Sequence, residues 1–118
     1  MNIDREWLAR LPKTDLHVHL DGSLRLATFM ELGPAAGLDM SGTAADVRAR
    51  YFPAERETCM HEFLSHFEHT GAVLQTAPNL ERVARELVED FAADGVWYVE
   101  VRFCPLFHGR RGLSPDQA

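Results

Sequence analysis

His17 and His19 lie one residue apart near the start of the chain, in the stretch DLHVHLDGS, with Asp15 before them and Asp21 after them. Apolar residues alternate with these polar ones, which is the period of a β-strand, so both imidazoles point to the same face. They are about 6.6 Å apart along an extended backbone, and two imidazoles can converge on one ion at about 2.0–2.1 Å. The pattern favours a metal site over an exposed strand with two ordinary histidines.

The residues around the pair strengthen this interpretation. Leu16 and Val18 indicate a buried strand, in which two unpaired histidines would be unfavourable. The Asp-Gly-Ser that follows predicts a turn at the carboxyl end of the strand, where α/β folds place their sites. Asp21 can meet a substrate there. Two ligands are too few for a catalytic metal site, so we expect further ligands from elsewhere.

The remaining histidines do not supply another recognisable motif. HEFLSH has one residue more than the metalloprotease pattern H-E-x-x-H, and a spacing of five on a helix sets His61 and His66 about 140° apart. His66 and His69 share a helix face, which we expect to be solvated. The chain has neither the Cys-x-x-Cys and His-x-Glu of cytidine-type zinc deaminases nor a phosphate-binding glycine loop.

Hydrophobic periodicity predicts an α/β fold with two strands. The first expected elements are a short helix capped by Asp4 and ended by Pro12, a strand over 13–20, and a helix over 24–33 with Ser23 as N-cap. A short helix after Thr43 and helices over 58–75 and 79–93 follow, the last with Gly95 at its C-terminal cap. The last expected element is a strand over 96–103. Helices between two strands indicate a parallel pair.

The long helical connection also carries the stripe Met60, Phe63, Leu64 and Phe67. Such a stripe is typical of an ordinary core. A connection of about 75 residues, much longer than a usual crossover, also allows a helical insertion that covers a site. Both interpretations remain open on the residues alone.

The last residues, GLSPDQA, have the signature of a helix start, with Ser114 as N-cap and Gln117 completing a capping box. Two strands do not make a stable sheet alone. We therefore expect residues 1–118 to be the incomplete N-terminal portion of a longer domain. A frayed tail on a small complete domain is the alternative.

Composition excludes several classes of protein. The net charge of −6 disfavours binding to nucleic acid, and no apolar run approaches the length of a membrane span. The N-terminus shows no secretory signal, so we expect a cytoplasmic protein in which Cys59 and Cys104 are free thiols. The charge is compatible with a small uncharged substrate. The oligomeric state is not indicated.

At the level of motifs, LPKTDLHVHLDGSL resembles the first strand of the adenosine deaminase family, a branch of the metal-dependent amidohydrolases. GVWYVEVRFCP followed by GLSP is similar to the second strand and next helix start, and the HEFLSHF segment is similar to the helical flap over the purine pocket. The resemblance covers about residues 5–118 and implies the first two parallel strands of a (β/α)8 TIM barrel, with a helical insertion between them. Such a barrel needs about 250 residues.

The resemblance also implies roles for individual residues. His17 and His19 would be zinc ligands, with His19 also near the substrate, and Asp21 would contact a ribose hydroxyl. Met60, Phe63, Leu64 and Phe67 would line the apolar side of the purine pocket. The catalytic acid/base residues and the other ligands would come from later strands, so none is expected within this chain, and the 118-residue chain alone is expected to be inactive.

The reaction that the family implies is hydrolytic deamination. Zinc lowers the pKa of a bound water, and the hydroxide attacks C6 of adenosine or 2′-deoxyadenosine, giving inosine or 2′-deoxyinosine and ammonia in purine salvage. The expected partner is thus a small purine nucleoside. The segment RFCPLFHGRRGLSP departs from many members, which leaves the pocket rim open.

Several alternatives remain at this stage. Related branches act on adenine, AMP or other 6-aminopurine compounds, although Asp21 favours a substrate with a ribose. Cyclic-amide hydrolases tend to carry an arginine after the histidine pair, where this chain has Leu20-Asp21-Gly22, and phosphoesterases would need more histidines soon after it. A non-catalytic fragment is the alternative from a different class.

Overall fold

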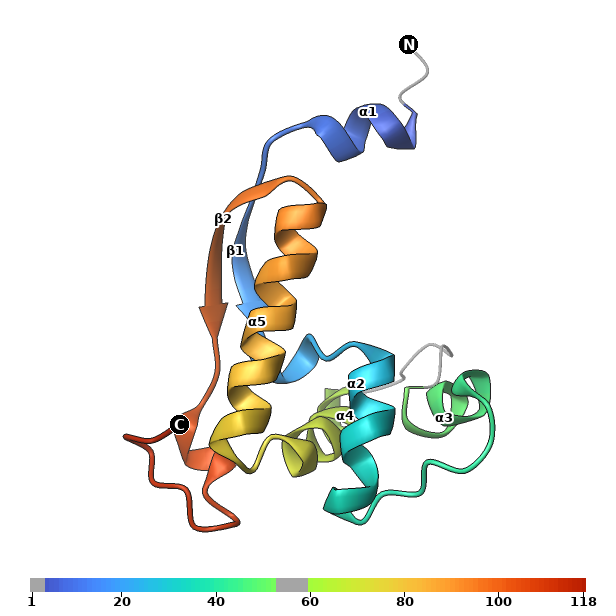
Figure 1. The fold of residues 1–118 in the computed structure, drawn as a ribbon, viewed down its shortest axis with the longest axis vertical. Coiled ribbons are helices and arrows are strands. Elements are labelled where there is room, and N and C mark those ends of the chain that lie inside the picture. The colour runs from blue at the N-terminus through green and yellow to red at the C-terminus, as the bar shows by residue number, and fades with distance from the viewer. Residues whose placement is uncertain (1–3, 53–59) are drawn as a thin grey trace.

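The computed structural model describes residues 4–52 and 60–118, and of residues 60–63 it describes the backbone alone. Two strands, β1 (Lys13–His19) and β2 (Val96–Arg102), pair in parallel, with Val18 opposite Val101 and His19 opposite Arg102. Figure 1 shows both arrows pointing the same way, with α5 (Ala77–Ala93) lying along them. The predicted parallel pair is confirmed.

The helices that flank the sheet begin and end at the expected signals. Asp4 accepts a hydrogen bond from the backbone of Trp7 and caps α1 (Arg5–Arg10), which ends before Pro12. Thr76 caps α5. Gly95, with φ 76°, follows the last turn of α5 in the left-handed region that glycine adopts without strain. These features direct the chain from α5 straight into β2.

Between the strands lies a helical insertion made of α2 (Leu26–Leu32), α3 (Ala44–Tyr51) and α4 (Met60–Val73). Thr43 and Asp46 form a complete capping box at the start of α3, so the short helix predicted after Thr43 is confirmed. In Figure 1 the insertion lies beside the carboxyl ends of the strands. The insertion is thus placed where a site is expected.

One predicted cap is wrong, and another is seen in part. Ser23 does not cap α2, because its hydroxyl donates a hydrogen bond to the carbonyl of His19 at 2.6 Å and the helix begins after Arg25. The residues between His19 and Ser23 form the short helix η1 (Leu20–Gly22). At the other end, Ser114 donates its N–H to the Gln117 side chain, but residues 115–117 form a turn rather than a helix.

The core forms two adjoining clusters. Val18 of β1 and Leu20 of η1 pack against Leu74 and the apolar face of α5. The buried residues of that face are Leu80, Val83 and Leu87. Phe29 of α2 packs with a second group, Val47, Tyr51 and Val73. Leu16, predicted to be buried, is 58% exposed, and it lies where the register of the two strands is irregular, between Asp15 and Val18.

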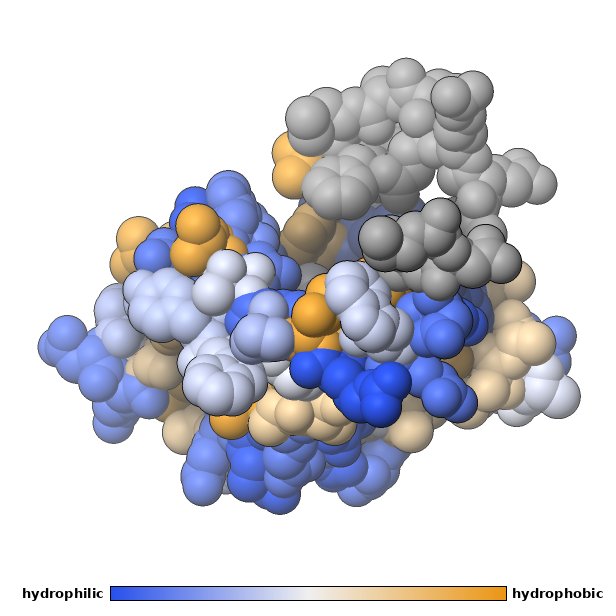
Figure 2. Space-filling view, turned by 90° about the horizontal axis from the view of Figure 1, so that it is seen from above, coloured by the Kyte–Doolittle hydropathy of each residue, from blue (hydrophilic) through white to orange (hydrophobic). Residues whose placement is uncertain are grey.

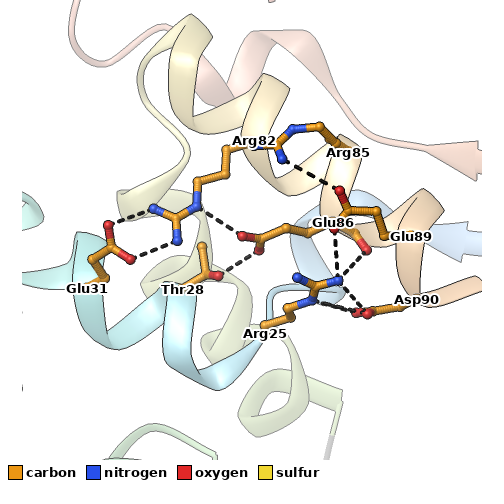
Figure 3. A network of polar contacts seen from close by, with 8 residues as sticks. All are labelled: Arg25, Thr28, Glu31, Arg82, Arg85, Glu86, Glu89 and Asp90. Atoms are coloured by element: carbon orange, nitrogen blue, oxygen red, sulfur yellow. Dashed lines mark hydrogen bonds and ion pairs between the residues drawn. The ribbon is translucent and has the colours of Figure 1, made fainter. Parts of the chain in front are cut away.

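A network of ion pairs fastens α2 and the residue before it to α5 (Figure 3). Arg25 donates to both oxygens of Asp90, and Arg82 donates to both oxygens of Glu31. Thr28 donates to the buried carboxylate of Glu86 at 2.6 Å. The insertion is therefore tied to the sheet-covering helix by charged hydrogen bonds, which are stronger than neutral ones.

In the described part of the chain, no helix is long and apolar enough to cross a membrane. Cys104, the described cysteine, is a free thiol. Cys59 lies outside the described residues.

Candidate active site

The imidazoles of His17 and His19 meet on one face of β1. Their Nε2 atoms are 3.2 Å apart, and their ring centroids are 5.2 Å apart. Alternation along the strand brings them to the same side, and Val18 between them is buried in the core on the opposite side. The structure thus brings together the two residues that the sequence singled out as ligands.

This separation suits a shared metal ion. Two nitrogens bound tetrahedrally at about 2.0–2.1 Å would be about 3.3 Å apart, which is close to the observed Nε2–Nε2 distance of 3.2 Å. Within the described residues, no group of three or more His, Cys, Asp or Glu side chains is placed to hold a metal ion. The pair fits zinc as part of a ligand set and does not complete one.

Asp21 follows the pair in η1, just past the end of β1. Its Oδ1 lies 3.8 Å from Nδ1 of His19, too far for a direct hydrogen bond. The carboxylate is largely buried, and this oxygen has no hydrogen-bond partner among the described residues. Asp21 therefore lies beside the histidine pair with one buried oxygen that has no partner among the described residues.

A cavity of about 580 Å³ adjoins these residues, within the range of pockets that hold small molecules. It lies between η1, helix α4 and the segment after β2, which begins with the short helix η3 (Pro105–His108). The described residues that line it are His19, Asp21, Leu64, Phe67, Glu68, Gly71, Phe107, His108 and Arg110. The cavity therefore joins the carboxyl ends of both strands to the helical insertion.

Two of the four predicted apolar pocket residues lie in this cavity. Phe67 packs edge-on against the ring of His19, with centroids 6.0 Å apart, and Leu64 lines the wall one turn earlier on α4. Gly22 permits this approach, because a Cβ there would lie 3.3 Å from the Phe67 ring. The side chains of Met60 and Phe63 lie outside the described residues.

The prediction of a solvated face for His66 and His69 is wrong. Both are partly buried, because the end of α3 packs beside α4. The ring of His69 lies edge-on to Tyr51 with centroids 4.9 Å apart, and His66 lies near Phe52 at 6.4 Å. These histidines pack the insertion and are separate from the His17–His19 pair.

Sequence reasoning missed the contribution of the segment after β2. His108 is 1% exposed and lines the cavity, as do Phe107 and Arg110. The side chain of Gln75 holds this segment, because it donates to the carbonyl of Phe107 and accepts from the N–H of Arg110. The rule that predicted Asp21, a polar residue directly after the carboxyl end of a parallel strand, does not single out His108, which lies at the end of η3 rather than directly after β2.

Comparison with known proteins gives a consistent result. Residues 12–118 match the family model described as adenosine deaminase. The chain is 46% identical over 108 residues to the adenosine deaminase of Vibrio vulnificus, covering 90% of this chain and 32% of that protein. It is 39% identical over 117 residues to the adenosine deaminase of Mycobacterium avium, and this match covers 98% of this chain and 32% of that protein. The chain thus spans about a third of the length of these relatives.

Solved structures share the fold. An Arabidopsis N6-mAMP deaminase superposes with a TM-score of 0.68 at 35% identity, covering 85% of this chain and 29% of that one. Arabidopsis ADAL complexed with IMP superposes with a TM-score of 0.67 at 34% identity, and this match covers 85% of this chain and 29% of that one. The two-stranded arrangement with its helical insertion is therefore that of adenosine deaminase-like folds.

Proposed function

The chain belongs to the adenosine deaminase family, and we propose that it is the first part of a zinc-dependent hydrolase that deaminates adenosine and 2′-deoxyadenosine. In this proposal residues 1–118 are the incomplete N-terminal portion of a single (β/α)8 barrel domain. The observation that carries it is the pairing of His17 with His19, because His19 lines a cavity that Asp21 also lines.

His17 and His19 would hold zinc as two of its ligands, and the bound ion would supply the activation of water that hydrolysis at C6 of the purine needs near neutral pH. The strand fixes both rings on one face, so the pair needs little rearrangement to bind the ion. Loss of ammonia requires acid/base residues, and we place none of them within this chain. Its role is to bind and orient.

The substrate is oriented by residues from two elements. Phe67 and Leu64 of α4, together with the expected Met60 and Phe63, offer an apolar wall to the purine ring. Asp21 accepts a hydrogen bond from a ribose hydroxyl through its unpartnered buried oxygen. An acidic acceptor at this position favours a nucleoside over a free base.

Charge favours a nucleoside over a nucleotide. Asp21 and Glu68 bring two carboxylates to the cavity, whereas Arg110 brings one guanidinium. A phosphate dianion in this space meets net repulsion, while an uncharged ribose does not. A deaminase of nucleotides is nevertheless a second candidate, because Arg110 lines the cavity and solved neighbours include complexes with IMP and GMP.

Turnover by the zinc-loaded full-length protein separates these candidates. We expect kcat/KM for adenosine to exceed that for AMP, N6-methyl-AMP and adenine by at least about tenfold, which corresponds to about 1.4 kcal/mol. Preference for either nucleotide, with a larger loss of AMP turnover than of adenosine turnover in Arg110→Gln, would instead establish the second candidate. Ammonia release measured for each substrate gives the answer.

A further inference from the structure

The cavity contains two buried acceptors whose partners are missing. In the described part of the chain, the buried side-chain polar atoms without a hydrogen bond are Oδ1 of Asp21 and Nε2 of His108, and both residues line the same cavity. Native proteins rarely leave such atoms unsatisfied without a reason. The coincidence of both in one cavity indicates a ligand that carries more than one hydrogen-bond donor.

The hydrogen bonding of His108 determines what its free nitrogen can do. Nδ1 lies 2.8 Å from the carbonyl oxygen of Leu74. A carbonyl oxygen only accepts, so Nδ1 carries the proton and donates it. In the neutral imidazole, Nε2 is then unprotonated and is an acceptor. The wall of the cavity therefore includes a residue with a buried acceptor nitrogen, His108, in addition to Asp21 with its buried carboxylate oxygen.

The segment that carries His108 is held in place before any ligand arrives. Gln75 bonds both the Phe107 carbonyl and the Arg110 N–H, at 3.0 and 2.9 Å. Gln75 is itself 3% exposed, and His108 also contacts the ring of Phe103, with centroids 5.7 Å apart. Binding at Nε2 therefore requires little ordering of the loop, which is the condition under which a single hydrogen bond contributes most to affinity.

We infer that His108 is a further substrate-binding residue, whose Nε2 accepts a hydrogen bond from a second hydroxyl of the ribose that Asp21 contacts. This inference rests on the proposed function, because it takes the occupant to be a purine nucleoside. The neutral purine of adenosine has its donors on the exocyclic amino group, which is the group that leaves. The ribose has several hydroxyl donors, so two acceptors in one cavity match a sugar.

Substitution by asparagine isolates the proposed contact. In His108→Asn the amide nitrogen can replace Nδ1 as donor to Leu74, while the acceptor at the Nε2 position is lost. A matched control is His69→Asn, which removes a partly buried histidine of α4 that packs on Tyr51 and does not line this cavity. Thermal unfolding of both variants reports whether the fold is retained.

Calorimetry on the zinc-loaded full-length protein measures the contact without turnover, using inosine and its 2′-, 3′- and 5′-deoxy analogues. We expect His108→Asn to weaken inosine binding by about two- to twelvefold, the range for one neutral hydrogen bond, and His69→Asn to leave it unchanged. The analogue that lacks the contacted hydroxyl should bind the variant and the unsubstituted protein equally. An equal loss for all four ligands, or no loss for inosine, overturns the inference.

A second measurement needs no substitution. In histidine-labelled protein, the nitrogen resonance of His108 Nε2 should shift upfield when inosine binds, as expected for an unprotonated nitrogen that gains a donor, and should not shift with the analogue that lacks the hydroxyl. Absence of any shift with bound inosine contradicts the inference, even if His108→Asn fails to fold.

The two proposals fail separately. Deamination of adenosine without a hydroxyl-specific loss in His108→Asn refutes the role of His108 alone. Hydroxyl-specific loss in a protein that does not deaminate adenosine refutes the proposed reaction alone. If inosine does not bind the unsubstituted protein, the role of His108 is refuted as well.

Discussion

At the residue scale, the proposed metal binding depends on geometry that one strand imposes. Because His17 and His19 are two residues apart on β1, they face the same side, and their Nε2 atoms already lie at a distance that suits two ligands of one ion. Among the residues that the structure describes, neither ring has a hydrogen bond to a carboxylate, and Asp21 lies 3.8 Å from His19. Orientation of the pair therefore depends on the strand itself and on the Phe67 ring.

In the full-length protein, His19→Ala is expected to remove zinc and deaminase activity together. The loss of affinity should exceed the roughly 10- to 100-fold that follows loss of an outer-shell partner, because a direct ligand disappears. Metal analysis of the purified variant and adenosine turnover give the two readings. The His69→Ala variant should retain its zinc, because His69 packs on Tyr51, apart from His17 and His19. Retention of zinc and activity by His19→Ala would refute ligation.

Asp21→Ala tests the ribose contact. A hydrogen bond to a charged acceptor contributes about 1.5–3 kcal/mol, so kcat/KM for adenosine should fall by about ten- to a hundredfold. Inhibition by adenine, which has no ribose, should change little. A comparable loss for adenine would mean that Asp21 supports the cavity as a whole rather than the sugar.

The sequence predicted where His17, His19 and Asp21 lie because their positions depend on local rules, the period of a strand and the location of a strand end. It did not predict the position of His108, since the burial of that ring depends on a carbonyl 34 residues away at Leu74. His66 and His69 were misjudged for a related reason. Whether their helix face is solvated depends on where α3 packs, which no local pattern encodes.

At the element scale, α2 is fastened to α5 around one buried carboxylate. Glu86 is 7% exposed and accepts from Thr28 and from Arg82, at 2.6 and 2.9 Å. Thr28 is itself 2% exposed. Burial alone would raise the pKa of Glu86, but the hydrogen bonds from Thr28 and Arg82 outweigh it and lower that pKa. The hydrogen bonds from these donors thus favour the charged carboxylate against the effect of burial.

Thr28→Val keeps the shape of the side chain and removes the donor. We expect the full-length protein to lose about 1–3 kcal/mol of unfolding free energy, the range for a buried acceptor that loses its partner. Urea unfolding at neutral pH measures the loss. Arg85→Gln is the matched control, because its pair with Glu89 is exposed at 3.5 Å and contributes little. Equal effects of the two substitutions would contradict this account of the network.

The same network predicts a dependence of stability on pH. Hydrogen bonds from Arg82 lower the pKa of Glu31, and hydrogen bonds from Arg25 lower the pKa of Asp90. The pKa of Glu86 is lowered as well. A carboxyl whose folded pKa is depressed stabilises the fold above its unfolded pKa and loses that contribution as pH falls through the folded value. Stability should therefore decline once pH drops below about 4.5, the ordinary value for Glu.

Urea midpoints between neutral pH and pH 3 test the direction of this dependence. The double variant Arg25→Gln, Arg82→Gln should start lower and fall less steeply with acid, because its carboxyls have lost the donors that depress their pKa values. Arg85→Gln should follow the unsubstituted protein. A double variant with an undiminished acid slope would place the sensitive carboxyls elsewhere.

Sequence patterns predicted elements well where the deciding contacts are within a few residues. Thr43 and Asp46 cap α3 as their spacing implies, and Gly95 ends α5. Ser23 did not follow its pattern, because the last carbonyl of β1 was the nearer partner for its hydroxyl. Caps compete with tertiary partners, and the short stretch between β1 and α2 offers such a partner.

At the scale of the whole molecule, the sheet is the least covered part. α5 lies against one side of β1 and β2, while Leu16, Trp97 and Val101 are 58%, 84% and 41% exposed. Leu106 and Phe107 beyond β2 are also exposed. The face seen in Figure 2 shows hydrophobic side chains scattered among hydrophilic ones. A two-stranded sheet with one covered side is marginal in water, so the strands need further partners to be stable.

The isolated 118-residue chain is therefore expected to fold poorly and to have no deaminase activity. It should bind zinc weakly, because its described residues gather two metal ligands and no third. It should also enhance the fluorescence of a dye that binds exposed apolar surface, whereas the full-length protein should not, since a closed barrel would cover Trp97 and its neighbours.

Two measurements on the purified chain test its activity and its zinc affinity. Conversion of adenosine to inosine is compared with that of His17→Ala, which controls for contaminating deaminase, and calorimetry gives the zinc affinity. Because both zinc and substrate need groups from other strands, we expect activity equal to that of the control and no submicromolar zinc binding. Turnover above the control would mean that the acid/base residues lie within these 118 residues, and tight zinc binding would mean that a third ligand does.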